Sequence, residues 1–277
     1  PDNIDERNQI RAEGIRLLRS LHESKKYFRI IIVGHSLGSV IGYDIIRHLW
    51  VDLRESHDPK QVKQELAKEF DKEFDTATRA SISVEDFQQK QHKLWREHRA
   101  VGIPWLVTDF ITLGSPLTYA SLLMVSDPQS FEQRKIEYEL PCCPPVFIQG
   151  EHTHYQKSYQ SANQQHPLNV RIPHHGAPFA STRWSNLFFP YKWGILGDMI
   201  GGPLSGCFGA GIKDIPLHPS GRGFLGKSLF SHTYYWKRPA DSAKTESIEA
   251  LKSAMRLESL YAKEGWPEPT QLHRKEI

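Results

Sequence analysis

The chain carries, at residues 28–42, the sequence FRIIIVGHSLGSVIG, and the organisation of the remaining chain can be worked out from this stretch. Residues 30–33 form an apolar, β-branched run that predicts a strand buried on both faces, and residues 39–50 predict an apolar helix. Residues 34–38 lie between them and match Gly-x-Ser-x-Gly, the pattern of a nucleophile elbow on a tight strand-to-helix turn. The two glycines let the strand and helix backbones approach closely, which leaves Ser36 in a strained conformation. We therefore expect its hydroxyl at the carboxyl end of the strand, beside the positive end of the helix dipole.

The composition of the chain is that of an ordinary globular protein. Its 277 residues are 39% hydrophobic and 24% charged, which is enough for a sizeable core. The net charge of +3, without a basic stripe interleaved with aromatic residues, argues against a nucleic-acid partner. No apolar run approaches the ~20 residues that span a bilayer. Cys142, Cys143 and Cys207 form no C-x-x-C pair, which favours free thiols in a reducing compartment and hence a cytoplasmic protein.

Helices and strands are expected to alternate along the chain, which predicts an α/β fold with a mostly parallel sheet flanked by helices. An amphipathic helix precedes the strand at residues 30–33, because its apolar residues recur at helical spacing. The later elements predicted from apolar patterning are strands at 105–113, 183–189 and 212–217 and a helix within 242–263. Residues 1–277 are interpreted as a single domain, in which residues 264–277 form a loose polar tail.

Residues 51–100 are a charged, helical insertion that follows the helix of the elbow. Leu66, Phe70 and Phe74 recur every four residues among charged neighbours, which predicts one helix with an apolar stripe. A second helix is expected from residue 84, because Ser83 and Asp86 have the spacing of a capping arrangement. Two interpretations stay open: a cap or lid that covers the serine, or a solvated helical hairpin packed on the sheet.

Residues 126–183 are rich in proline and predict loops. They also contain several histidines, at positions 152, 154, 166, 174 and 175. Imidazole suits zinc or iron, but the spacing matches no metal-binding template such as H-E-x-x-H. We therefore predict neither a metal site nor a bound cofactor.

Several segments, taken with the elbow, resemble the α/β-hydrolase superfamily and in particular its lipase-like and esterase-like members. They are Thr-Leu-Gly-Ser-Pro at 112–116, Trp-x-Asn-Leu-Phe at 184–188, Asp-x-Ile-Gly-Gly-Pro at 198–203 and Ser-His-Thr-Tyr-Tyr-Trp at 231–236. The resemblance implies a Ser36, Asp198, His232 catalytic triad, in the order Ser, acid, His along the chain. It also implies the corresponding fold, a mostly parallel sheet with the helical insertion placed after the elbow helix.

Other residues compete for these roles. Asp214 is the alternative acid and His218 the alternative base, since both lie near the last predicted strand. Ser115 is a rival nucleophile, but Pro116 disfavours the helix whose N-terminus would stabilise an oxyanion.

The resemblance implies a serine hydrolase that cleaves carboxylic esters through an acyl-enzyme. We expect the backbone N–H of Leu37 to bind the oxyanion, with His35 beside it also serving oxyanion or substrate binding. Relatives have several strands before this point, and only about 27 residues precede the strand here. The chain thus resembles the C-terminal two-thirds of such a domain, and two interpretations stay open: the sequence is a fragment, or the protein completes its sheet in another way. Since Pro1 is not a natural initiator, we expect the native N-terminus and the second oxyanion donor upstream.

The expected partner is a small-molecule ester or lipid. The aromatic residues Phe188, Phe189, Tyr191 and Trp193 are consistent with binding of acyl chains or with peripheral contact with a membrane, and a buried strand end explains them as well. Two alternatives stay open: acyltransferase or thioesterase chemistry on the same triad, and a non-catalytic interaction module that retains a vestigial triad. If the side chains of Ser36, Asp198 and His232 lie within hydrogen-bonding distance of one another, an enzyme is favoured over a non-catalytic interaction module.

Overall fold

The computed structural model of the chain describes residues 4–55, 59–73, 83–123, 128–147, 152–160, 167–191, 197–218, 229–236 and 245–257. The helices are α1 (Ile4–Glu23), α2 (Leu37–Leu53), α3 (Glu65–Glu73), α4 (Val84–Val101), α5 (Ala120–Leu123), α6 (Pro128–Ile136), α7 (Ser205–Phe208) and α8 (Glu246–Met255). The strands are β1 (Ile30–His35), β2 (Val107–Leu113), β3 (His154–Tyr159), β4 (Leu168–Pro173), β5 (Arg183–Phe188) and β6 (Lys213–Pro216). Short 3₁₀ helices follow at Pro116–Tyr119, Pro178–Ala180 and Leu229–Trp236.

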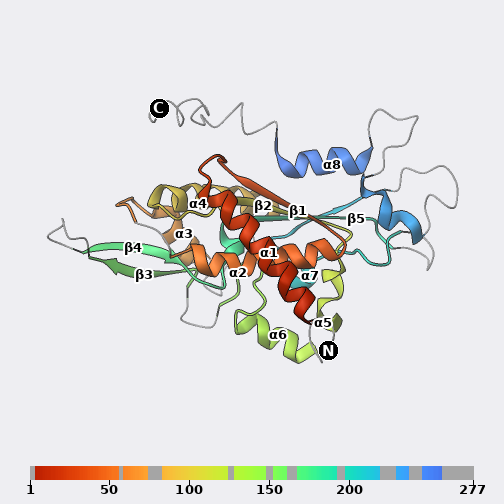
Figure 1. Cartoon of the computed structure of the whole chain (residues 1–277), viewed down its shortest axis with the longest axis horizontal. Helices are drawn as coiled ribbons and strands as arrows, with labels where there is room; N and C mark the ends of the chain where they lie inside the picture. The colour runs from red at the N-terminus through yellow and green to blue at the C-terminus, as the bar shows by residue number, and fades with distance from the viewer. Residues whose placement is uncertain are drawn as a thin grey trace.

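Of the strands in the described ranges, four form a parallel sheet in the order β1-β2-β5-β6, which confirms the predicted α/β class. The helix α2 lies on one face of this sheet and α8 on the other (Figure 1). Each face has its own apolar cluster, because the side chains of a strand alternate between the two faces. Phe110 and Trp184 pack with the α2 side, whereas Ile111 and Leu187 pack with the α8 side.

The strand β1 was expected to be buried on both faces, and that expectation is wrong. Among the described strands β1 pairs only with β2, so it lies at an edge of the sheet, and Val33 is 36% exposed. The two strands that are buried throughout are the central ones, β2 and β5. An apolar, β-branched run therefore identified the strand but not its position in the sheet.

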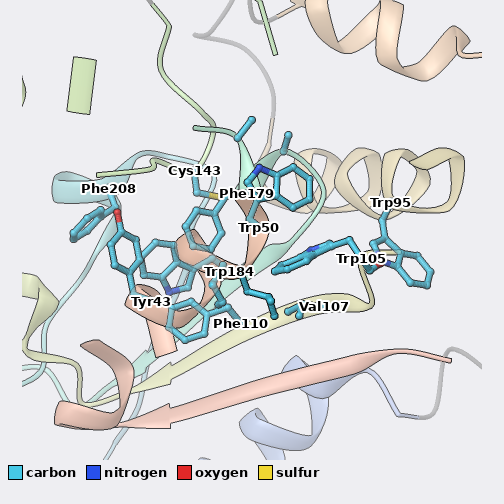
Figure 2. Packing of buried hydrophobic residues seen from close by; sticks show 14 of the residues in the cluster. Tyr43, Trp50, Trp95, Trp105, Val107, Phe110, Cys143, Phe179, Trp184 and Phe208 are labelled. Carbon is cyan, nitrogen blue, oxygen red and sulfur yellow. The ribbon is translucent and has the colours of Figure 1, made fainter. Parts of the chain in front are cut away.

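Aromatic side chains fix α2 against the sheet. Tyr43 on α2 lies with Phe179, Trp184 and Phe208 in the buried cluster that Figure 2 shows, with ring centroids 5.9, 5.6 and 5.2 Å from its own. Its hydroxyl donates to the carbonyl of Pro141 at 2.9 Å, so the buried polar end is satisfied. Such a cluster sets the position of α2, and with it the position of the residues that begin this helix.

The predicted insertion contains two helices, α3 and α4, and Ser83 caps α4 as expected, accepting from the Asp86 N–H at 3.1 Å. Two glutamines of α4 donate to carbonyls at the start of β5 or just before it: Gln88 to Trp184 at 3.0 Å, and Gln91 to Thr182 at 3.0 Å. These contacts hold α4 at the amino ends of the strands. Because the serine of the elbow follows the carboxyl end of β1, they give no support to a lid, and that role stays a prediction.

The region expected to be loops contains elements that the sequence did not predict, the helix α6 and the antiparallel hairpin β3-β4. His154 on β3 is fully buried and its Nδ1 lies 3.0 Å from Oδ1 of Asp71, while its Nε2 lies 2.9 Å from Nε2 of His98. The network therefore ties the hairpin to α3 and α4. Within the described ranges, no three His, Cys, Asp or Glu side chains are grouped so that they could hold a metal ion.

Several parts of the sequence interpretation fall outside the described ranges. These are the polar tail at 264–277, His166, Phe74 of the predicted apolar stripe and residues 192–193 of the aromatic segment. The C-terminal helix is described as Glu246–Met255, within the predicted 242–263. Among the described residues, no helix is both long enough and apolar enough to cross a membrane.

Candidate functional site

Ser36 occupies the strained turn that its motif predicts. Its backbone has φ 52° and ψ −129°, in the left-handed half of conformational space that non-glycine residues seldom adopt. A Cβ at Gly34 would lie 2.6 Å from the Cα of Ser39, so only glycine lets the end of β1 pass this close to the start of α2. The Ser36 N–H donates to the carbonyl of Leu113 at 3.0 Å, which ties the turn to the end of the neighbouring strand β2.

Asp198 and His232 meet at the same edge of the sheet. His232 Nδ1 lies 2.9 Å from Oδ2 of Asp198, and the Asp198 side chain is fully buried while His232 is 17% exposed. The second carboxylate oxygen, Oδ1, accepts the N–H of Ile200 at 2.8 Å. The Asp198 N–H in turn donates to the carbonyl of Phe189, just beyond β5, at 3.2 Å. A carboxylate so held fixes the imidazole tautomer with the proton on Nδ1 and leaves Nε2 to accept one.

Tyr235 also belongs to this site, and the sequence did not identify it. Its hydroxyl donates to Oδ2 of Asp198 at 2.9 Å and accepts the N–H of Phe189 at 3.1 Å. Burial, and after it the charge of Asp198, raises the pKa of the hydroxyl well above its usual value, so it stays protonated and able to donate. The signal was present as a tyrosine three residues after His232, but its role depends on the fold of the 3₁₀ turn Leu229–Trp236.

His35 was expected to serve oxyanion or substrate binding, and its side chain has a different contact. Its Nε2 lies 2.9 Å from the carbonyl oxygen of His232, where it can only donate, and the two imidazole rings stack with centroids 4.9 Å apart. The residue before Ser36 thus holds the backbone of the residue expected to be the base. Leu37, the other residue expected here, begins α2 and is 64% exposed.

Gly114 packs directly beneath the Asp198–His232 pair. It has φ +53°, and a Cβ there would lie 2.6 Å from Cε2 of Tyr235, 2.7 Å from Oδ2 of Asp198 and 3.1 Å from Nδ1 of His232. Its chain neighbour Leu113 accepts the N–H of Ser36, as described above. The last residue of β2 and the residue that follows it therefore contact both the serine turn and the acid–base pair.

The three alternative residues have other partners. Asp214 accepts from the Asn186 amide at 2.7 Å and from two backbone N–H groups at 2.9 Å, those of Leu204 and Ser205. His218 pairs with Glu246 at 3.2 Å on an exposed part of the surface. Ser115 is buried, with its hydroxyl 2.6 Å from that of Ser39. The structure thus brings Asp198 and His232 into contact with each other, and His35, next to Ser36, contacts the backbone of His232. Within the described ranges no hydrogen bond joins the Ser36 hydroxyl to His232, so that contact of the expected triad stays a prediction.

Comparisons of the chain with protein-family models, with curated proteins and with solved structures found no match in any of the three. A function for the chain is therefore inferred from the chemistry and geometry of this site.

Proposed function

We propose that this chain is a serine hydrolase of the α/β-hydrolase type, which cleaves carboxylic esters through a triad of Ser36, His232 and Asp198. The observation that carries the proposal is the 2.9 Å contact between His232 Nδ1 and Asp198 Oδ2 beside a serine on a strained strand-to-helix turn. An idle serine in a glycine-rich turn would need neither a backbone at φ 52° nor a buried acid–base pair next to it.

The reaction follows from the protonation states that these contacts select. With its Nδ1 proton donated to Asp198, His232 accepts the hydroxyl proton of Ser36 on Nε2 as Oγ attacks the ester carbonyl. The Leu37 N–H at the start of α2 faces the developing oxyanion, and the helix dipole adds a positive potential there. His232 then protonates the leaving alkoxide, and a water activated by the same imidazole hydrolyses the acyl-enzyme.

The carboxylate of Asp198 is positioned to stabilise the positive charge of the His232 imidazolium that forms in each step. It accepts from Ile200 N–H and Tyr235 hydroxyl as well as from His232, so its charge is stabilised without a solvent-exposed side chain. The expected substrate is a small-molecule ester or a lipid, and a cytoplasmic location is proposed from the free cysteines.

A fluorophosphonate probe tests the proposal, because it reacts only with an activated serine and forms a stable adduct. In the full-length protein the probe should label Ser36, as mapped by peptide mass spectrometry, and Ser36→Ala should abolish both labelling and hydrolysis of p-nitrophenyl esters. Ser20→Ala, a change on an exposed face of α1, serves as the matched control and should leave labelling intact. Unlabelled wild-type protein, or labelling that persists in Ser36→Ala, would refute the assignment.

A further inference from the structure

A chain of buried hydroxyl groups runs from the loop after β2 to the carbonyl of Ser36. The Ser39 hydroxyl lies 2.6 Å from this carbonyl oxygen and 2.6 Å from the Ser115 hydroxyl. Ser115 Oγ in turn accepts the N–H of Leu117 at 3.2 Å. Both serine residues are completely buried, so their hydroxyl groups cannot form hydrogen bonds with bulk water instead.

The direction of each hydrogen bond in this chain follows from counting protons. The Ser36 carbonyl can only accept, so the Ser39 hydroxyl proton is donated to it. Ser39 has no second hydroxyl proton, and Ser115 must therefore be the donor between the two serines. Ser115 is left with a lone pair for the Leu117 N–H, and every donor in the chain is used once.

The Ser36 carbonyl belongs to the same planar peptide unit as the N–H of Leu37. Fixing the oxygen therefore fixes the direction of that N–H on the opposite side of the unit, and a hydrogen bond to the oxygen polarises the N–H. Ser39 donates twice to this one oxygen, by its backbone N–H at 2.9 Å and by its hydroxyl. Ser36 makes no side-chain cap to α2, so the start of the helix is held by Ser39 and the Ser36 hydroxyl stays uncommitted.

We propose that Ser39, held in place by Ser115, is a positioning residue for the oxyanion donor, aligning and polarising the Leu37 N–H through the Ser36 carbonyl. The inference rests on the proposed hydrolase function, and it adds two residues from outside the triad to that site. Because Ser39 acts through a peptide group, its loss should cost less than the ~10²–10³-fold in kcat that removal of a direct oxyanion donor costs. We expect a loss of about tenfold in kcat with KM unchanged.

Kinetics of three variants test the inference in the full-length protein. Ser39→Ala removes the donor and leaves the Ser115 hydroxyl without an acceptor, so it should lower both kcat and Tm. The double variant Ser39→Ala with Ser115→Ala removes both hydroxyls and also the acceptor of the buried Leu117 N–H, so Tm should stay low. Its kcat should equal that of Ser39→Ala, because Ser115 acts only through Ser39. Ser181→Ala, at a buried serine near the amino end of β5, is the matched control and should leave kcat unchanged.

Inhibition by a trifluoromethyl ketone distinguishes a positioning role of Ser39 from a purely structural one, because a purely structural role would leave the inhibition constant unchanged. The adduct of the ketone with Ser36 carries an oxyanion, so its inhibition constant should rise about tenfold in Ser39→Ala, in proportion to the fall in kcat/KM. Variants that are labelled by fluorophosphonate and lose Tm, yet keep wild-type kcat and inhibition constant, would overturn the positioning role alone. A wild-type protein that the probe does not label would overturn the proposed function and this inference together.

Discussion

Tyr235 donates its hydroxyl proton to Oδ2 of Asp198 at 2.9 Å, the carboxylate oxygen that also lies 2.9 Å from Nδ1 of His232. One oxygen atom thus holds both the expected base and a phenol from the same 3₁₀ turn. The phenol also accepts the N–H of Phe189, so it anchors the acid to the backbone just beyond β5. The orientation of the acid is therefore set by a residue that need not contact the substrate.

Tyr235→Phe tests this arrangement. The change deletes one donor to Asp198 and leaves the Phe189 N–H buried without its acceptor, which should cost about 1–3 kcal/mol of unfolding free energy. We expect kcat/KM for a p-nitrophenyl ester to fall roughly tenfold, well short of the ~10⁴-fold lost when a triad carboxylate is replaced by an amide. Tyr27→Phe, at an exposed tyrosine, is the control. A Tyr235→Phe variant that is less stable but fully active would show that the phenol only supports the fold.

Gly114→Ala should disrupt the acid–base pair directly. The residue has φ +53°, which costs an alanine about 1–2 kcal/mol, and the new methyl group would meet Asp198 Oδ2 at 2.7 Å. Displacement of reacting groups by about 1 Å can reduce a rate ~10²-fold, and we expect at least that loss in the rate of fluorophosphonate labelling. Gly206→Ala is the matched control, since its Cβ would meet nothing within 4 Å. Labelling of Gly114→Ala at the wild-type rate would contradict this account of the site.

The sequence predicted those strands and turns whose conformation depends on their own residues and not on contacts with distant parts of the chain. Apolar, β-branched runs identified β1 and β2, and the glycine spacing around Ser36 identified the turn, because both depend on local conformation. Asp198 and His232 were located through a resemblance to known motifs, and the structure brings these two side chains into contact.

What the sequence did not show depends on which elements become neighbours. The hairpin β3-β4 lies in a proline-rich stretch. Its buried and exposed residues alternate over only a few positions in each strand, so the sequence shows no clear two-residue hydrophobic period there. The contacts of Tyr235 and His35 are made across the sheet edge, between residues about 40 and 200 positions apart. The edge position of β1 depends on which strands pair with it, a property that no single strand encodes.

Asp109→Asn should destabilise the fold through a buried ion pair. Arg183 donates to both oxygens of Asp109 at 2.8 Å, and each side chain is only 3% exposed. Removing one charge of such a pair leaves the other uncompensated, which costs about 3–5 kcal/mol. Urea unfolding at pH 7 measures this loss. Asp52→Asn breaks the exposed pair with Arg19 and should cost under about 1 kcal/mol, so equal losses in the two variants would contradict the prediction.

Glu55 should make the free energy of unfolding depend on pH in the acidic range. Burial works to raise the pKa of its carboxyl, but hydrogen bonds from Lys157 and Tyr155 and the nearby Arg54 outweigh it and lower the pKa from 4.5 to about 2. Because the folded-state pKa is the lower one, the stabilisation is present above the unfolded value and is lost as the pH falls from 4.5 towards 2. The Glu55 carboxylate is 31% exposed, so solvent screens its interactions. We therefore expect the ionised carboxylate to contribute only about 1–2 kcal/mol to the free energy of unfolding.

Glu55→Gln should therefore lower the unfolding free energy by about 1–2 kcal/mol at pH 7, and the difference from wild type should shrink as the pH is lowered below 4.5, where the wild-type carboxylate begins to lose its advantage. Urea unfolding at pH 7, 4.5 and 3 measures this trend. Glu132→Gln, which alters an exposed carboxylate on α6 paired with Lys135, should change stability little at any of these values. If the Glu55→Gln difference were the same at all three pH values, the contacts of Glu55 would stabilise the fold by packing or neutral hydrogen bonding, because only an ionised carboxylate loses its advantage when it is protonated.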